Sequence, residues 1–125
     1  MGCAMGCSKY VLIVDDNQDF ADALAALVRA LGHNAIAAYD AVTGLTLAHA
    51  RTPDIIFHDI AMPGMNGYTA VQKLREHSKF ENTTIVAITA FSGCADHARS
   101  LASGFDQHIG KPAEIEDIKS VLEAR

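Results

Sequence analysis

The sequence predicts an α/β fold in which a five-stranded parallel sheet is covered by helices on both faces. Short apolar runs alternate five times with longer segments of helical period. Three of the runs are continuously apolar, as expected for central parallel strands that are buried on both faces. The chain has 125 residues, of which 50% are hydrophobic and 20% charged, and this suits one globular domain.

The five apolar runs predict the strands at 11–14, 35–38, 55–57, 85–88 and 107–109. The first predicted helix carries apolar residues at helical spacing and ends before Gly32, because glycine is favoured just past a helix end. These residues are Phe20, Leu24, Leu27, Val28 and Leu31. The later helical stripes are each narrow enough to be buried on one side of the sheet: Val42, Leu45 and Ala48; Val71 and Leu74; Ala98, Leu101 and Ala102; and Ile115, Ile118 and Leu122.

Right-handed crossovers between such units give a doubly wound sheet with five helices, for which the flavodoxin-like strand order 2-1-3-4-5 is the common small solution. We expect one domain over residues 10–125, a short flexible leader over residues 1–9, and no DNA-binding output domain in this chain. Gly2 and Cys3 weakly resemble a dual-acylation signal, but Gly6 stands where the myristoylation pattern requires Ser or Thr.

Charge and composition exclude several classes of function. The formal net charge is −5 and the basic residues are scattered, so we expect no direct binding to nucleic acid. No apolar run approaches the roughly 20 residues that span a bilayer, so we expect no membrane partner. Three cysteines, two of them in the first seven residues, do not form a disulfide framework, and a reducing cytoplasm fits them best.

Polar side chains follow the predicted strands at the points where the strands end. Asp15 and Asp16 follow the first strand, Asp59 the third, Thr89 the fourth and Lys111 the fifth. Because ligand sites in open α/β sheets lie beyond the carboxyl ends of the strands, we expect these side chains to converge. Three adjacent carboxylates repel one another unless a cation neutralises them, and an oxygen-only set of ligands favours Mg²⁺ over zinc. An aspartate can be the nucleophile of phosphoryl transfer, with the lysine and the threonine binding phosphoryl oxygens.

One ordered pattern carries a resemblance to a known family: Asp15-Asp16, Asp59 followed by Met62-Pro63-Gly64, then Thr89-Ala90 and Lys111-Pro112. Over residues 10–125 the chain resembles the receiver domain of two-component response regulators, as found in single-domain regulators and in hybrid kinases. The resemblance implies that Asp59 accepts a phosphoryl group from a histidine kinase or a histidine phosphotransfer protein, in a two-component system or phosphorelay. It also implies that Mg²⁺, or Mn²⁺ in its place, is bound by Asp59, by Asp16 directly, by Asp15 largely through water and by the backbone carbonyl of Ala61.

The resemblance further implies a switch formed by Thr89 and by residue 108, where this chain has His108 instead of the family's usual Tyr or Phe. Phosphorylation would shift the face made by the fourth helix, the fifth strand and the fifth helix, to which a downstream protein binds. Two smaller implications are a cis Lys111-Pro112 bond and a role for Phe91 in shielding the phosphoryl group, for which plain packing is the alternative.

Each site residue also has a plain structural interpretation. Aspartates after a strand often cap the next helix, and Thr89 and Lys111 could be a strand end and a surface lysine. Their joint placement at the strand ends favours the site. His58 points away from Asp59 in an alternating strand and is expected to be structural. The remaining histidines apart from His108 show no ligand spacing and are expected at the surface: His33, His49, His77 and His97.

We expect the chain to act as a switch that assists its own phosphorylation and dephosphorylation, and not as an enzyme. A Mg²⁺-dependent phosphohydrolase is the enzymatic alternative, but its nucleophile motif has a second aspartate where this chain has Ala61. A docking module that is never phosphorylated would not need the intact acidic set. A flavin-binding electron carrier would need a Ser/Thr-rich phosphate loop after the first strand, which is absent from the sequence.

Overall fold

The computed structural model describes residues 8–90 and 93–123 and contains the expected parallel sheet. Its strands are β1 (Tyr10–Val14), β2 (Asn34–Ala38), β3 (Ile55–His58), β4 (Thr84–Thr89) and β5 (Gln107–Gly110). Neighbouring strands all pair in parallel, in the order β2-β1-β3-β4-β5. The predicted doubly wound topology is therefore confirmed. Most of the expected leader and Phe91 lie outside the described residues.

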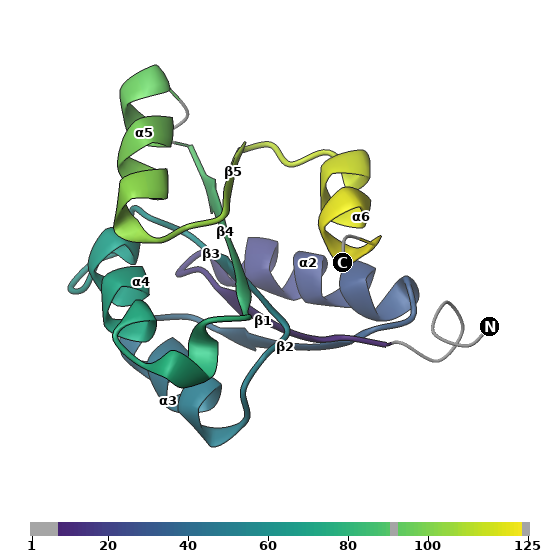
Figure 1. The fold of residues 1–125 in the computed structure, drawn as a ribbon. Coiled ribbons are helices and arrows are strands. Elements are labelled where there is room, and N and C mark those ends of the chain that lie inside the picture. The colour runs from purple at the N-terminus through teal and green to yellow at the C-terminus, as the bar shows by residue number, and fades with distance from the viewer. Residues whose placement is uncertain (1–7, 91–92, 124–125) are drawn as a thin grey trace.

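Helices cover both faces of the sheet (Figure 1). On one face lie α2 (Gln18–Ala30) and α6 (Ile115–Glu123), and on the other lie α3 (Ala41–Ala50), α4 (Gly67–Arg75) and α5 (Cys94–Ser103). A 3₁₀ turn, η1 (Ser78–Phe80), follows α4. Alternate residues of each central strand enter the two cores, so that Val11 and Ile13 face α2 and α6 while Leu12 and Val14 face the other layer.

The helix ends follow their local sequence. Side chains of Asn17, Asp40 and Asn66 accept hydrogen bonds from backbone amides in the first turns of α2, α3 and α4. Gly32 has φ 97° just past the end of α2, in the left-handed region that favours glycine. The glycine stop expected there is confirmed. Within the described residues, no helix combines the length and the apolar character needed to cross a membrane.

The expected inward stripe of α3 is wrong in part. Val42 is 62% exposed, and the buried residues are Ala41, Gly44 and Ala48. The helix packs so closely on β1 that a Cβ added to Gly44 would lie 2.7 Å from a methyl carbon of Val14. Small residues make this approach possible, and the larger Val42 is left on the surface.

The expected stripe of α5 is also wrong, because Leu101 is 56% exposed while Ser100 and Ser103 are buried. A polar contact decides the orientation: the hydroxyl of Ser100 lies 2.7 Å from Nδ1 of His108 on β5. In α6, Ile118 and Leu122 are buried as expected, but Ile115 is exposed. The helices beside β5 therefore leave apolar side chains on the surface.

Candidate functional site

The sheet brings the predicted site residues to one edge. The residues just beyond β1, β3 and β5 keep bonding to the neighbouring strand, so the backbone that carries their side chains is held in place. Three amide-to-carbonyl hydrogen bonds do this: Asp15 to Ala38 at 3.0 Å, Asp59 to Val14 at 2.8 Å, and Lys111 to Thr89 at 2.8 Å.

The three carboxylates form one cluster. One carboxylate oxygen from each of Asp15, Asp16 and Asp59 lies within 4.8 Å of the other two. Asp15 and Asp59 are buried and Asp16 is exposed, so the cluster opens to solvent on the Asp16 side. This is the convergence that the strand ends predict.

Lys111 supplies the positive charge of the cluster. Its Nζ lies 2.8 Å from Oδ2 of Asp15 and 3.7 Å from Oδ2 of Asp59. The same ammonium lies 4.5 Å from the centre of the Phe20 ring, so an aromatic face from α2 helps to hold it. One lysine thus contacts two buried carboxylates, and the site retains excess negative charge.

Asp59 is surrounded by groups with opposing effects on its ionisation. Burial raises the pKa of its carboxyl group, and the charge of Asp15 raises it further. The ammonium of Lys111, the amide of Ile60, which donates to Oδ1 at 2.8 Å, and the hydroxyl of Thr89 act against this increase. The net direction is upward, so the ionised carboxylate is held at a cost that a bound cation would relieve.

These residues fit Mg²⁺. The donors are all carboxylate oxygens, the set that hard cations prefer, and one side is left for water or a phosphoryl oxygen. The pKa of Asp59 is raised first by burial and then by the charge of Asp15, so a cation bound here would stabilise its ionised form. Ala61 lies in the exposed loop after β3, and the role of its backbone carbonyl stays a prediction.

Two residues contact the backbone carbonyl of Asp59. Nδ1 of His58 donates to the Asp59 carbonyl at 2.7 Å, and burial lowers the pKa of this histidine to about 4, so its ring is neutral near pH 7. Gly67 packs against the same carbonyl, at a distance that leaves no space for a side chain. The structural interpretation of His58 agrees with these contacts. The sequence reasoning did not single out Gly67, and the signal available for it was a glycine directly after the Asn66 cap.

The expected switch residues lie on adjacent strands. Thr89 at the end of β4 is fully buried, and His108 on β5 is partly buried. The ring of His108 stacks on that of His97, with 4.1 Å between centroids and 19° between planes, and its Nδ1 contacts Ser100. His97 was expected to be an isolated surface residue. It is exposed, but it is one half of a stacked pair with the switch position.

The Lys111-Pro112 peptide bond is cis, as the resemblance implies. This places the bond directly after the lysine of the cluster. Of the residues expected at the site, Asp15, Asp16, Asp59, Thr89 and Lys111 are brought together. His108 lies farther back on β5, the strand that precedes Lys111, and pairs with Ala87 of β4.

Comparisons with known proteins show which proteins this chain is similar to. The family model described as "Response regulator receiver domain" matches residues 11–123. Response regulator PleD of Caulobacter vibrioides is 35% identical over 111 residues, which are 89% of this chain and 24% of PleD. Protein PilG of Pseudomonas aeruginosa is 28% identical over 114 residues, which are 91% of this chain and 84% of PilG.

A solved structure of the chemotaxis protein CheY4 of Vibrio cholerae superposes with a TM-score of 0.86 at 25% identity. The match covers 92% of this chain and 96% of CheY4. This chain therefore spans about a quarter of PleD, and nearly the whole of CheY4.

Proposed function

This chain belongs to the response regulator receiver domain family, and we propose that its Asp59 accepts a phosphoryl group from the phosphohistidine of a histidine kinase or a phosphotransfer protein. Receiver domains are signalling domains of two-component systems, and they act with such kinases and with downstream effectors. The observation that carries the proposal is the contact of one lysine with two buried carboxylates, at the sheet edge where Asp16 and Thr89 also lie.

The chemistry needs a nucleophile and groups that stabilise the transferred phosphoryl group. Oδ1 of Asp59 is occupied by the Ile60 amide, so Oδ2, which faces Lys111, is the oxygen that attacks phosphorus. The new O–P bond forms as the P–N bond to the donor imidazole breaks, and the imidazole leaves with a proton from solvent. Lys111 and the hydroxyl of Thr89 then bind phosphoryl oxygens, which orients the group and offsets its charge.

The residues that would hold Mg²⁺ are Asp15, Asp16 and Asp59, together with the backbone carbonyl of Ala61. When bound, the ion supplies positive charge that offsets the carboxylates and the charge of the transferred phosphoryl group. Asp15 contributes in a second way, because it also fixes the ammonium of Lys111 at 2.8 Å. Asn17 donates its backbone amide to Asp15 at 2.9 Å and keeps that carboxylate oriented.

The switch follows from Thr89. Its hydroxyl bonds Asp59 before phosphorylation and would follow the phosphoryl group afterwards, which biases the position of β4 relative to β5. His108 and its contact to Ser100 would carry this change to α5. The downstream partner would then bind the face made by α5, β5 and α6, where Leu101 and Ile115 are exposed.

Mass spectrometry tests the phosphoacceptor. The protein is incubated with Mg²⁺ and a small acyl phosphate, and we expect it to gain the mass of one phosphoryl group. Asp59→Asn should gain none. Asp54→Asn is the matched control, because Asp54 lies at the opposite end of the same strand and asparagine can still accept the bond from the Tyr10 amide. Equal labelling of Asp59→Asn, or no labelling of the wild type, would contradict the proposal.

A second experiment tests the partner face. Leu101→Glu places a charge on the exposed surface of α5, remote from the acidic cluster. We expect this variant to be phosphorylated like the wild type and to lose binding to the downstream protein. Loss of phosphorylation with unchanged partner binding would be the opposite of this expectation.

A further inference from the structure

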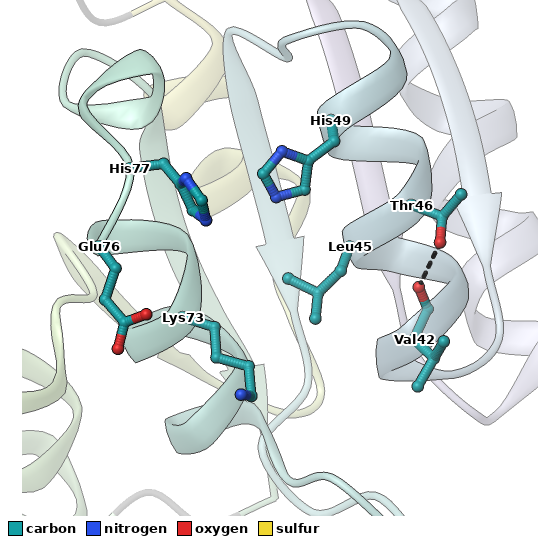
Figure 2. Close-up of a pocket in the computed structure, with 7 residues that line it drawn as sticks. All are labelled: Val42, Leu45, Thr46, His49, Lys73, Glu76 and His77. Carbon is teal, nitrogen blue, oxygen red and sulfur yellow. Dashed lines mark hydrogen bonds between the residues drawn. The ribbon is translucent and has the colours of Figure 1, made fainter.

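A groove separates α3 from α4, on the layer that packs against one face of the sheet (Figure 2). Its volume is about 480 Å³, within the range of small-molecule sites in proteins. It shares no residue with the acidic cluster. The residues that line it are Val42, Leu45, Thr46, His49, Lys73, Glu76 and His77.

Nitrogen donors gather in this groove. Figure 2 shows the imidazoles of His49 and His77 pointing toward one another from the two walls, and their ring centroids are 4.8 Å apart. The side chain of Lys73 extends from α4 into the space between the two helices, with its ammonium directed away from the two imidazoles. Among the described residues, none accepts a hydrogen bond from the side-chain nitrogens of His49, Lys73 or His77, so these donors are available to a ligand.

Lys73 in the lining and Lys79 beside it outnumber the one carboxylate of the groove, that of Glu76. The pKa of His49 is lowered by burial and then by the positive charges of His77 and Lys79. Lys79 reaches this position because its ammonium donates to the His49 carbonyl at 2.9 Å. Glu76 is the one acidic residue in the lining, and its carboxylate stays on the α4 side (Figure 2). A divalent cation would be repelled by the two lysines, whereas an anion would be attracted.

The opposite part of the groove is apolar. Leu45 is partly buried and Val42 is 62% exposed. Phe80 packs against the histidines, and its ring is edge-to-face with that of His49 at a centroid distance of 5.1 Å. An apolar wall beside a cluster of cationic donors matches a ligand with both characters.

We propose that this groove binds a small organic anion, in which a carboxylate or phosphate group contacts His49 and His77, Lys73 attracts the negative charge, and an apolar body lies against Leu45 and Val42. The proposal goes beyond phosphorylation of Asp59, because the groove uses different residues and a different layer of the fold.

Binding should be linked to protonation. The charged and titratable groups around His49 are Lys73 from α4, Glu76 and His77 from the residues after that helix, and Lys79 from η1. An anion adds negative charge beside His49 and so raises its pKa, and the complex takes up a proton. Affinity should therefore increase by about threefold to tenfold from near pH 8 to near pH 6.

Two-dimensional NMR titration of the full chain tests the proposal. Benzoate and phenyl phosphate are the probes, and benzyl alcohol is the neutral control of similar shape. We expect saturable shifts in α3 and α4 with a dissociation constant on the order of 1 mM for at least one of the anions, and at least about tenfold weaker binding of the alcohol. Binding by only one anion would identify the preferred head group.

Variants locate the site. Lys73→Met should weaken anion binding by about tenfold, while Glu76→Gln should strengthen it by about threefold, because the two changes move the charge of the groove in opposite directions. Lys119→Met on α6 removes the same charge elsewhere and should leave the affinity unchanged. Equal binding of the alcohol, wild-type affinity in Lys73→Met, or no saturable shift with either anion would each overturn the proposal. None of these results depends on phosphorylation of Asp59.

Discussion

Gly67 begins α4 directly against the backbone of the proposed phosphoacceptor, and replacing it with alanine tests that contact. A Cβ at this position would lie 2.3 Å from the carbonyl oxygen of Asp59 and 2.7 Å from Cα of Ile60. Favourable separations between carbon atoms are about 3.5–4.0 Å. Both obstacles are backbone atoms, which cannot rotate away as a flexible side chain could. The loop after β3 would therefore have to move.

The magnitude follows from two opposing effects. Adding a methyl group to a well-packed region costs about 1–3 kcal/mol, and a clash with backbone belongs at the upper end of that range. Against this, alanine stabilises a helix interior by about 1 kcal/mol relative to glycine, and by less at the first helical residue. We expect Gly67→Ala to lower the free energy of unfolding by about 2 kcal/mol, and to slow phosphorylation of Asp59.

Urea unfolding followed by circular dichroism measures this change, since the chain has no tryptophan to report it by fluorescence. With a typical slope of about 1–2 kcal/mol per molar urea, the midpoint should fall by roughly 1–2 M. Gly93→Ala is the control, because the nearest atom to a Cβ there is a carboxylate oxygen of Asp96 at 3.5 Å. Gly93 is the N-cap of α5, so alanine there should cost only about 0.5–1 kcal/mol, through weaker capping. If Gly67→Ala unfolds at the same urea concentration as the control, the packing argument is wrong.

Three further predictions concern charge. The pKa of buried His58 is lowered to about 4, so the free energy of unfolding is unaffected by this group above pH 6.5 and falls by up to about 3 kcal/mol as the pH falls toward 4. In urea melts across that range His58→Gln should lose less stability than the wild type, and an equal loss would contradict the assignment. Because burial and Asp15 raise the pKa of Asp59, its ionised form destabilises the fold at neutral pH. Without Mg²⁺, Asp59→Asn should therefore melt at a higher temperature than the wild type at pH 7, and the difference should vanish below about pH 4. Mg²⁺ at ten times its dissociation constant should stabilise the wild type by about 1.4 kcal/mol and the variant by less. The guanidinium of Arg75 donates to four acceptors on the segments that precede β4 and β5, so Arg75→Lys should lower the free energy of unfolding by about 2 kcal/mol. Arg29→Lys loses one bond to a backbone carbonyl and should cost under about 1 kcal/mol. Equal costs in thermal melts would refute this.

The acidic cluster was predictable because each of its residues has a local sequence signal. An apolar run gives the end of a strand, and parallel pairing brings the carboxyl ends of all strands to one edge. Asp15, Asp59 and Lys111 could therefore be placed together although up to 96 positions separate the first from the last. Their roles in phosphoryl transfer stay predictions.

Residues that act through close packing could not be found in this way. The orientation of α5 depends on a hydroxyl of Ser100 that meets His108, and apolar spacing alone would turn Leu101 inward. The histidines show the same limit. His49 and His77 are 28 positions apart and look unrelated in the sequence, yet their rings are in contact across a groove.

By itself, the sequence determined the order of strands and helices, the topology of the sheet and the identity of the residues at the carboxyl ends of its strands. Those features follow from periodicity, from turn residues and from the handedness of crossovers, which are all short-range effects. Only the tertiary structure decided that Lys111 pairs with Asp15, that Gly67 supports Asp59 and that four histidines form two pairs. These contacts depend on how closely two elements approach, and that distance is set by the side chains of both elements together.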